Sequence, residues 1–448
     1  MPPTTPAASA RGRHRKPRTL SPAARRAIVF AAAAPVAGTI LTAPSAFAAG
    51  KDTAKNVGTA EYGLDPAEQK IADNLNSRVQ DPRLGTTVSG VVIDSESDKT
   101  VWGHGAETAL MPASNTKLAT ATAALTVLGP DHKFTTKVVY GDGTLTLVGG
   151  GDRTLTTADL EALAKTSVAG LKSAGLTSVK VRVDDSLFPE PTLATGWNGD
   201  YYPDTVAPVR PLVVDGHGVT DTSLDAGQVF AKSLADKGVT VTGEVTRGAS
   251  GEGDVPVAQH TSANLSTIVK HMLKVSDNNI AETLLRMTAL GAGRQATFED
   301  GTAVVREVLS STYGVSMDNF QMHDGSGLSR ATRIPAQTLV DILDLTTDPR
   351  YRTTLKSIKD GLPVAGEEGG TLGPGTGRFD TPDSKCAVGK VMAKTGTLTG
   401  AIALSGFTKA EDGQWKVFSF IENGSSADPA DTKDALDGLA ATVNGCWA

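Results

Sequence analysis

The sequence predicts an α+β protein in which one α+β domain interrupts another. In the outer domain, strand-like segments occur near the start of the folded part, at 88–95 and 100–105, and again after 389. Between 265 and 346, apolar residues recur at helical spacing. From 131 to 255, short strand-like and helical segments alternate, which indicates a separate α+β unit.

The domain boundaries follow from this pattern and from the length of the chain. Its 448 residues are enough for two or more domains. We divide them into a signal segment, a flexible polar stretch, a first domain in two pieces and an inserted α+β domain. The boundaries are, in the same order, 1–48, 49–64, 65–130 with 256–448, and 131–255.

The first 48 residues have the composition of a secretory signal. They contain seven basic residues and no acidic one, followed by an apolar run over 27–41 and a small-x-small cleavage site at 46–48. This order is typical of an exported protein that begins at or near Ala49 after cleavage. An uncleaved N-terminal anchor is the alternative, but the apolar run is short for a membrane span and Pro35 interrupts it.

The mature chain is acidic. Without the signal segment, the formal net charge changes from −6 to about −13. An acidic chain lacks the basic footprint of a nucleic-acid-binding protein. The sequence also shows no spacing of histidine, cysteine and carboxylate residues that is typical of a metal site. We therefore expect no nucleic acid, no metal and no cofactor.

The chain has two cysteines, Cys386 and Cys446. In an exported protein, two cysteines can join in one disulfide. Two separate thiols are the alternative, because the sequence does not establish the distance between them.

The first domain is expected to begin with a helix over 64–80, where Asp65-Pro66 is a start signal. A polar turn joins the two strand-like segments that follow, so they predict a hairpin. A helix over 114–128 comes next, and Gly129-Pro130 ends it. Later helices and strands are expected at 265–276, 279–290, 300–314, 335–346, 390–397, 401–409, 415–423 and 429–443.

The first candidate site is in "MPASNTKLAT", where Ser114 precedes Lys117 by three residues. On a helix, these positions share a face. A lysine beside a serine can remove the hydroxyl proton only if its amine is neutral. Burial and a second nearby cation both lower a lysine pKa. The pair therefore needs another positive group and a polar relay close by.

Two later motifs supply candidates for these groups. Ser276-Asp277-Asn278 stands at a break between two predicted helices, and Lys394-Thr395-Gly396 lies in a predicted strand. A glycine at 396 would let a substrate backbone approach that strand. Each motif alone is weak; Ser262-Ala263-Asn264 also has the serine-x-asparagine pattern, and we interpret it as a helix N-cap. The order and contexts of the three motifs form the signature of penicillin-binding proteins and class A β-lactamases.

With these motifs, the chain resembles the D-alanyl-D-alanine carboxypeptidase/endopeptidase family of low-molecular-mass penicillin-binding proteins over about 65–446. Four further segments match, although Arg153 stands where the family usually has proline. Between Asp200 and Ser276 there are 75 residues, which leaves room for one inserted domain but not for the second one that members commonly carry. The four segments are 145–155, 196–216, 324–330 and 362–372.

The resemblance implies a penicilloyl-serine transferase (β-lactamase/DD-peptidase-like) fold with the site between a sheet and a helical lobe. It also implies an exported, cell-wall-associated serine peptidase that hydrolyses the terminal D-alanyl-D-alanine bond of peptidoglycan stem peptides. The D-alanyl cross-links between stem peptides are a second possible substrate, because they contain a bond of the same kind. β-Lactams would acylate the enzyme, and no strong membrane anchor is expected after signal cleavage.

The resemblance also assigns roles to residues. Ser114 is the nucleophile, Lys117 takes its proton, and Ser276 relays that proton to the leaving amine. The substrate-binding residues are Asn278, Lys394, Thr395, Gly396, Thr397 and Asp200. Within this set, Asn278 holds the substrate amide, while Lys394 and Thr395 bind its carboxylate.

The backbone N–H groups of Ser114 and Thr397 would form the oxyanion hole. Asp200 would bind the free amine of a diaminopimelate side chain, and an exposed loop acid without a role is the alternative.

Two rival functions share these motifs. A β-lactamase needs efficient deacylation, for which class A enzymes use an extra glutamate; no Glu-x-x-Leu-Asn type of segment lies between Lys117 and Ser276. A non-catalytic β-lactam-binding or wall-binding protein is the second rival, and the three intact motifs argue against it. The sequence leaves the balance between carboxypeptidase and endopeptidase activity open.

Overall fold

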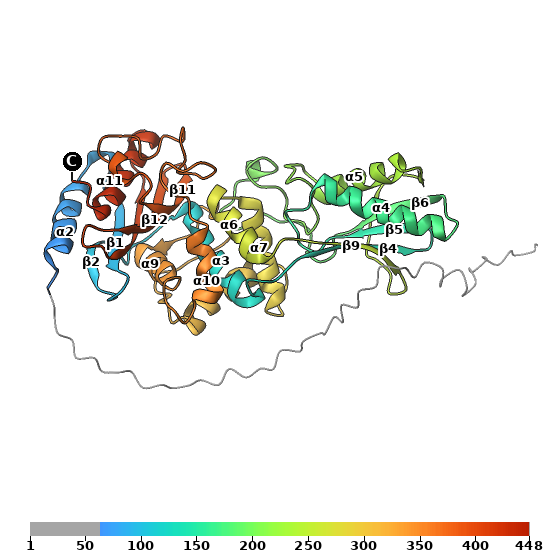
Figure 1. Cartoon of the computed structure of the whole chain (residues 1–448), viewed down its shortest axis with the longest axis horizontal. Coiled ribbons are helices and arrows are strands. Elements are labelled where there is room, and N and C mark those ends of the chain that lie inside the picture. Colours follow the sequence, from blue (N-terminus) through green and yellow to red (C-terminus); the bar gives the residue numbers. More distant parts are fainter. Residues whose placement is uncertain (1–62, 448) are drawn as a thin grey trace, which may run out of the picture.

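The computed structural model describes residues 63–447. The expected signal segment at 1–48 and nearly all of the polar stretch at 49–64 lie outside this range. Within it, every helix is too short or too polar to span a lipid bilayer. The overall class is α+β, as the sequence predicted (Figure 1).

The first domain is built on a five-stranded antiparallel sheet. Both ends of the chain contribute to it, since β1 pairs with β13 and places Val92 opposite Phe418. Helices cover both faces, so β12 and β13 are buried along almost their entire length. The strand order is β11 (Met392–Leu398), β12 (Ala401–Lys409), β13 (Trp415–Asn423), β1 (Val88–Asp94) and β2 (Thr100–His104).

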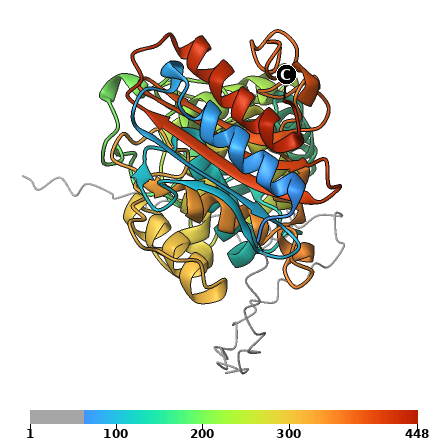
Figure 2. The ribbon, with the colours of Figure 1, turned by 90° about the vertical axis from the view of Figure 1, so that its left-hand side faces the viewer.

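Two helices from opposite ends of the chain cover one face of this sheet. α2 (Pro66–Arg78) and α11 (Pro429–Asn444) lie side by side in Figure 2, in blue and red, and share an apolar core with the sheet. The Asp65 carboxylate accepts hydrogen bonds from the N–H groups of Ala67 and Glu68. The start signal at Asp65-Pro66 is therefore confirmed.

A helical lobe covers the other face. α3 (Thr116–Leu128) lies at its centre and is buried on all sides over most of its length, which suits its alanine-rich sequence. The helices around it share one core with the inner face of the sheet. They are α6 (Leu265–Val275), α7 (Asn278–Gly291), α8 (Phe298–Glu307), α9 (Ala336–Asp344) and α10 (Arg352–Asp360).

The chain between α3 and α6 forms a second sheet with its own core. Helices α4 (Thr157–Ser173) and α5 (Thr222–Asp236) pack against each other and contribute to that core. Figure 1 shows this unit at the opposite end of the molecule from α2 and α11. Its strands are β4 (Thr135–Gly141), β5 (Thr144–Val148), β6 (Ser178–Asp184), β7 (Thr240–Val241), β8 (Thr246–Arg247) and β9 (Val255–Thr261).

The last of these strands extends past the boundary expected from the sequence. Val255 to Thr261 pairs antiparallel with β4, which makes it an edge of the inserted sheet. The sequence analysis placed residues from 256 onward in the first domain. The difference arises because the pairing of β9 with β4 joins segments more than 100 residues apart. Local composition does not reveal which distant strands pair.

The inserted unit also returns to the first domain through the segment between β6 and α5. In this segment, Trp197 is buried in the core of the first domain, and its Nε1 donates to Asp324 Oδ2 at 2.7 Å. Gly196 has a φ of +83°, and a Cβ there would lie 2.8 Å from the backbone nitrogen of Ala331. The Gly-Trp pair is therefore required by close packing against the loop that follows Asp324.

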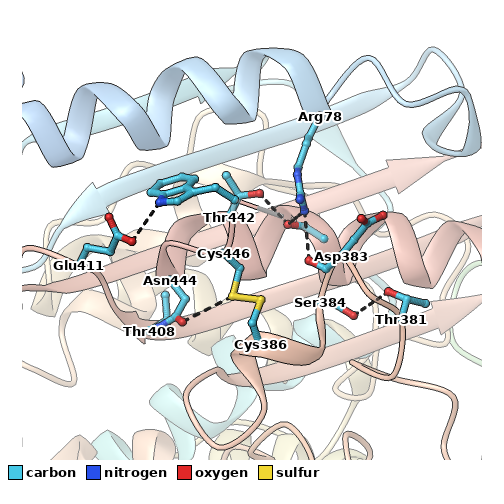
Figure 3. Close-up of a disulfide and its surroundings, with 12 residues drawn as sticks. Arg78, Thr381, Asp383, Ser384, Cys386, Thr408, Glu411, Thr442, Asn444 and Cys446 are labelled. Atoms are coloured by element: carbon cyan, nitrogen blue, oxygen red, sulfur yellow. Dashed lines mark hydrogen bonds between the residues drawn. A yellow bond between two sulfur atoms is a disulfide. The ribbon is translucent and has the colours of Figure 1, made fainter.

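The two cysteines form a disulfide, which the sequence left open. Cys386 and Cys446 are bonded, and the bridge ties the loop before β11 to the end of α11 (Figure 3). Near the bridge, Asn444 donates to Thr408 Oγ1. Closing a loop of 60 residues contributes about 4 kcal/mol in the chain-entropy account.

Candidate active site

Ser114 lies in a short 3₁₀ turn, Ala113–Asn115, that leads into α3. The sequence predicted a helix from Ser114 itself, but α3 begins at Thr116. Ala113, immediately before the serine, has a φ of +47°. This left-handed conformation is costly for a residue with a side chain and is found most often at functional sites.

The surrounding segments hold this turn closely. Asn423, at the end of β13, accepts from the Met111 N–H and donates to the Met111 carbonyl. A Cβ at Gly396 would lie 2.6 Å from the Pro112 carbonyl oxygen. The sequence analysis expected a substrate backbone at this glycine, whereas the close neighbour in the structure is the turn that carries Ser114.

Gly327 makes a similar approach from the other side of the turn. It has a φ of +83°, and a Cβ there would lie 1.9 Å from the Ala113 carbonyl oxygen. Two glycines therefore allow the strand β11 and the loop at 324–330 to touch the same turn. The position of Ser114 depends on both contacts.

Lys117 is fully buried next to the serine. Its Nζ lies 2.9 Å from Ser114 Oγ, and it donates to Asn278 Oδ1 and to the Ser326 carbonyl, each at 2.8 Å. A neutral amine has two N–H donors and one lone pair. If the two N–H groups serve Asn278 and Ser326, the lone pair faces the serine hydroxyl, which is the geometry that a general base needs.

Burial lowers the pKa of Lys117 to about 8. The negative charges of Glu282, Asp324 and Asp277 oppose this shift. A lysine with this pKa is mainly protonated at neutral pH, but its neutral fraction is far larger than that of an exposed lysine and grows as the pH approaches 8. The neutral amine is the protonation state that the Ser114-Lys117 hypothesis requires.

Lys394 is also fully buried, on β11. Its Nζ donates to Ser276 Oγ at 2.9 Å and to the Thr395 carbonyl at 2.7 Å. Burial lowers its pKa well below the usual value, and the charges of Lys117 and Arg378 lower it further. The structure thus places the third motif in direct contact with the second.

Ser276 and Asn278 lie where α6 ends and α7 begins. Ser276 is the C-cap of α6 in the left-handed conformation, with a φ of +62°, and Asp277 caps α7 by accepting from the Ile280 N–H. Asp277 therefore has a structural role. Asn278 donates through Nδ2 to the Thr205 carbonyl while its Oδ1 faces Lys117. The break between the helices turns both polar side chains toward Lys117 and Lys394.

A cavity of about 330 Å³ opens beside Ser114. Its walls are formed mainly by hydroxyl groups and cations, and it contains members of all three motifs. The lining residues are Ser114, Ser276, Thr371, Thr376, Arg378, Thr395, Thr397 and Lys433. Four of them, Thr371, Thr376, Arg378 and Lys433, were not identified as site residues from the sequence. Thr371 lies in the matching segment 362–372 but was given no role there, and the other three lie outside the motifs and matching segments.

Asp200 does not line this cavity. It lies exposed in a 3₁₀ turn, Gly199–Tyr201, where its N–H donates to Asn198 Oδ1. The turn belongs to the same segment as Thr205, whose carbonyl accepts from Asn278. Asp200 is therefore five residues from a backbone group that contacts Asn278, but it does not form part of the cavity wall.

Sequence analysis also missed two buried carboxylates, Glu282 and Asp324. Glu282 accepts from the N–H groups of Gly325 and Ser326, and so holds the loop whose Ser326 carbonyl binds Lys117. Asp324 accepts from the N–H groups of Gly327 and Ser329. Burial raises the pKa of both, that of Glu282 to about 7. Asp324 could have been found, because it begins the segment "DGSGLSR" that matches the family. Glu282 lies in no matching segment.

We expect Glu282→Gln to lower stability and to change the pH dependence of acylation. The amide offers one acceptor for two backbone N–H groups, so one buried donor loses its partner at a cost of about 1–3 kcal/mol. Because the Glu282 charge raises the pKa of Lys117, its removal should shift the rise in the rate of acylation to lower pH.

The measurements are denaturant unfolding and the rate of β-lactam acylation against pH. Glu299→Gln, on an exposed position of α8, is the matched control. An unchanged pH midpoint in Glu282→Gln would show that Glu282 only supports the loop.

Comparison with known proteins places this arrangement in a family. A profile of the D-Ala-D-Ala carboxypeptidase 3 (S13) family matches residues 71–220 and 216–443. Carboxypeptidase DacB of Mycolicibacterium smegmatis is 32% identical over 404 residues, which cover 85% of each chain. A D-alanyl-D-alanine carboxypeptidase of Actinomadura sp. (strain R39) is 30% identical over 469 aligned residues, covering 82% of this chain and 84% of the relative.

Solved structures show the same fold. The crystal structure of penicillin binding protein 4 (dacB) from Haemophilus influenzae matches with a TM-score of 0.71 at 22% identity, over 83% of this chain and 98% of that one. The penicilloyl-serine transferase fold expected from the resemblance is therefore confirmed. The chain belongs to the D-Ala-D-Ala carboxypeptidase 3 (S13) family of serine peptidases.

Proposed function

We propose that the protein is exported and hydrolyses the terminal D-alanyl-D-alanine bond of peptidoglycan stem peptides through an acyl-enzyme on Ser114. One observation carries this proposal: the amine of Lys117, fully buried with its pKa lowered to about 8, lies 2.9 Å from Ser114 Oγ. A serine with a neutral amine at hydrogen-bond distance is an activated nucleophile.

The first step forms the acyl-enzyme. Ser114 Oγ attacks the carbonyl of the scissile bond, and Lys117 takes the hydroxyl proton. The backbone N–H groups of Ser114 and Thr397 stabilise the oxyanion, which is consistent with the position of both residues on the cavity wall. Ser276 passes the proton to the leaving amine.

Lys394 contributes a positive charge behind Ser276, with which it shares a hydrogen bond. This charge attracts the terminal carboxylate of the substrate from behind the cavity wall, while Thr395 offers a hydroxyl on the wall itself. Asn278 holds the substrate amide. Water then attacks the ester on Ser114 and releases the shortened peptide.

The same machinery would cleave D-alanyl cross-links and react with β-lactams. A β-lactam presents a strained amide and a carboxylate to the same nucleophile. The penicillin binding protein 4 of Haemophilus influenzae has been solved in complex with a β-lactam. Among the described residues, the cavity wall has no carboxylate that could activate water, so we expect the penicilloyl ester to be released slowly, unlike that of a β-lactamase.

The decisive experiment is incubation of the mature protein with a defined muropeptide mixture, with the products identified by mass. Loss of one alanine from pentapeptides identifies carboxypeptidase activity, and conversion of cross-linked dimers to monomers identifies endopeptidase activity. Neither product with the wild-type protein would contradict the proposal. Export is tested separately by the N-terminus of the protein from its native host, which should be at or near Ala49.

We further propose that Asp200 binds the free amine of a diaminopimelate side chain in the substrate. A substrate with this amine free should react about ten to a hundred times faster than its N-acetylated copy, because a hydrogen bond to a charged group contributes about 1.5–3 kcal/mol. Asp200→Asn should remove most of this preference and leave penicillin acylation nearly unchanged, since penicillin lacks the amine.

A two-by-two comparison of free and acetylated peptide on wild type and variant gives the result. Asp204→Asn, an exposed acid in the same segment, is the control. Equal preference in wild type and Asp200→Asn would assign Asp200 to the exposed loop alone.

A further inference from the structure

The cations that line the cavity beside Ser114 are not the ones expected from the motifs. The wall contains Arg378 and Lys433, whereas Lys394 is fully buried and is not part of it. The Lys394 amine instead donates to Ser276 Oγ and to the Thr395 carbonyl. A group in the cavity therefore meets Arg378 and Lys433 before it meets Lys394.

Arg378 is held in place by Asp437, which accepts hydrogen bonds along one edge of the guanidinium. Only 4% of the Arg378 side chain is exposed. Its Nε donates to Asp437 Oδ2 at 2.9 Å, and its Nη2 donates to Asp437 Oδ1. Asp437 is fully buried on α11 and also accepts from the Phe379 N–H. Within residues 63–447, Nη1 has no hydrogen-bond partner, and the side chain lines the cavity.

Lys433 stands beside Arg378 because of helix geometry. It precedes Asp437 by four residues on α11, so both side chains lie on the same face of that helix. Lys433 is half-buried and lines the cavity, and no carboxylate of the described residues forms an ion pair with it. Asp437 therefore forms an ion pair with Arg378, whereas the charge of Lys433 has no ion-pair partner among the described residues.

The remaining lining of this wall consists of hydroxyl groups. Thr371 and Thr395 contact each other through their hydroxyl oxygens at 2.8 Å, and Thr376 lies two residues before Arg378. Fixed N–H donors, uncompensated positive charge and hydroxyl donors in one cavity are the chemistry that recognises a carboxylate.

We propose that Arg378 and Lys433 bind the carboxylate on the leaving-group side of the substrate, and that Lys394 acts on the reaction through Ser276 from behind the wall. This inference rests on the proposed function, because the scissile D-alanyl-D-alanine bond places the free carboxylate on the leaving residue. Arg378 and Lys433 are then specificity residues for a free C-terminus.

A purely structural role for Arg378, joining the loop at 376–380 to α11 through Asp437, is the competing explanation. A structural defect would slow all substrates alike. Loss of a carboxylate ligand would slow only the substrate that carries the carboxylate. Two peptides that differ in this group alone therefore separate the two explanations.

The experiment compares kcat/KM for a D-alanyl-D-alanine peptide and for its C-terminal carboxamide. Wild type should prefer the acid. In Lys433→Ala, the preference should fall several-fold, and in Lys433→Glu it should fall further, because a negative charge then faces the carboxylate. The double variant Arg378→Gln/Asp437→Asn removes both charges of the buried pair and should lose about ten- to a hundredfold of the preference, because the rate with the acid falls more than the rate with the amide.

Lys385→Ala, exposed in the loop that follows Arg378, is the control and should keep the wild-type preference. Thermal unfolding identifies any variant that fails to fold, and the two Lys433 variants test the inference independently of the buried pair. An unchanged acid preference in the folded Lys433 and Arg378/Asp437 variants would overturn the inference, as would a wild-type enzyme that cleaves acid and amide equally. A wild-type enzyme that cleaves neither would instead contradict the proposed function.

Discussion

Ser114→Ala is expected to abolish covalent labelling by penicillin and to remove peptidase activity. No other hydroxyl lies within hydrogen-bond distance of the Lys117 amine among the described residues, so no replacement nucleophile is activated. In comparable serine acyl-transfer enzymes, loss of the nucleophile lowers kcat by about 10⁶-fold. The half-exposed serine contributes little packing, and we expect the unfolding free energy to change by less than about 0.5 kcal/mol.

The measurement is the stoichiometry of a labelled penicillin on the intact protein, followed by mapping of the labelled peptide. Ser173→Ala, an exposed serine near the end of α4, serves as the control and should label fully. Full labelling of Ser114→Ala would show that the nucleophile has been assigned to the wrong residue.

Lys117→Met should lower the rate of acylation by about 10²–10⁴-fold, the usual contribution of a general base. Methionine has a similar volume, so the buried site stays filled, although Asn278 Oδ1 and the Ser326 carbonyl lose a donor. In the wild-type enzyme, the lysine pKa is lowered to about 8. Only the neutral amine accepts a proton, so the rate should rise as the pH increases toward 8 and level off above it.

This prediction is checked by measuring the second-order rate constant for penicillin acylation at pH values on both sides of 8. The rise should be absent in Lys117→Met and present in Lys165→Met, a control at an exposed position of α4. A wild-type rate that falls as the pH increases through 8 would show that the protonated lysine is the active form.

The three motifs could be found in the sequence because each is local. Ser114 and Lys117 lie within one helical turn, and the break at Ser276-Asp277-Asn278 is visible as an interruption between two helical patterns. A strand was expected at 390–397, and β11 (Met392–Leu398), which carries Lys394, lies there. The α+β class and the family resemblance followed from these features and are confirmed.

The other parts of the site could not be predicted, because they depend on segments that are far apart in the chain. Asp437 is 59 residues from Arg378, and their ion pair holds the Arg378 side chain at the cavity wall. Glu282 reaches Ser326 across 44 residues. No spacing rule connects such positions, since their contact is created by the packing of α7 and α11 against separate loops.

The sequence by itself determined the family and the candidate site residues: a serine, two lysines and a Ser-x-Asn break, in an order that is typical of the family. Only the tertiary structure decided the pKa values of the two lysines. Lys117 and Lys394 are ordinary lysines in the sequence, and they become weaker bases because the fold buries both. The nearby charge of Lys117 lowers the pKa of Lys394 further. Desolvation and charge proximity arise from three-dimensional packing, so they cannot be inferred from local sequence.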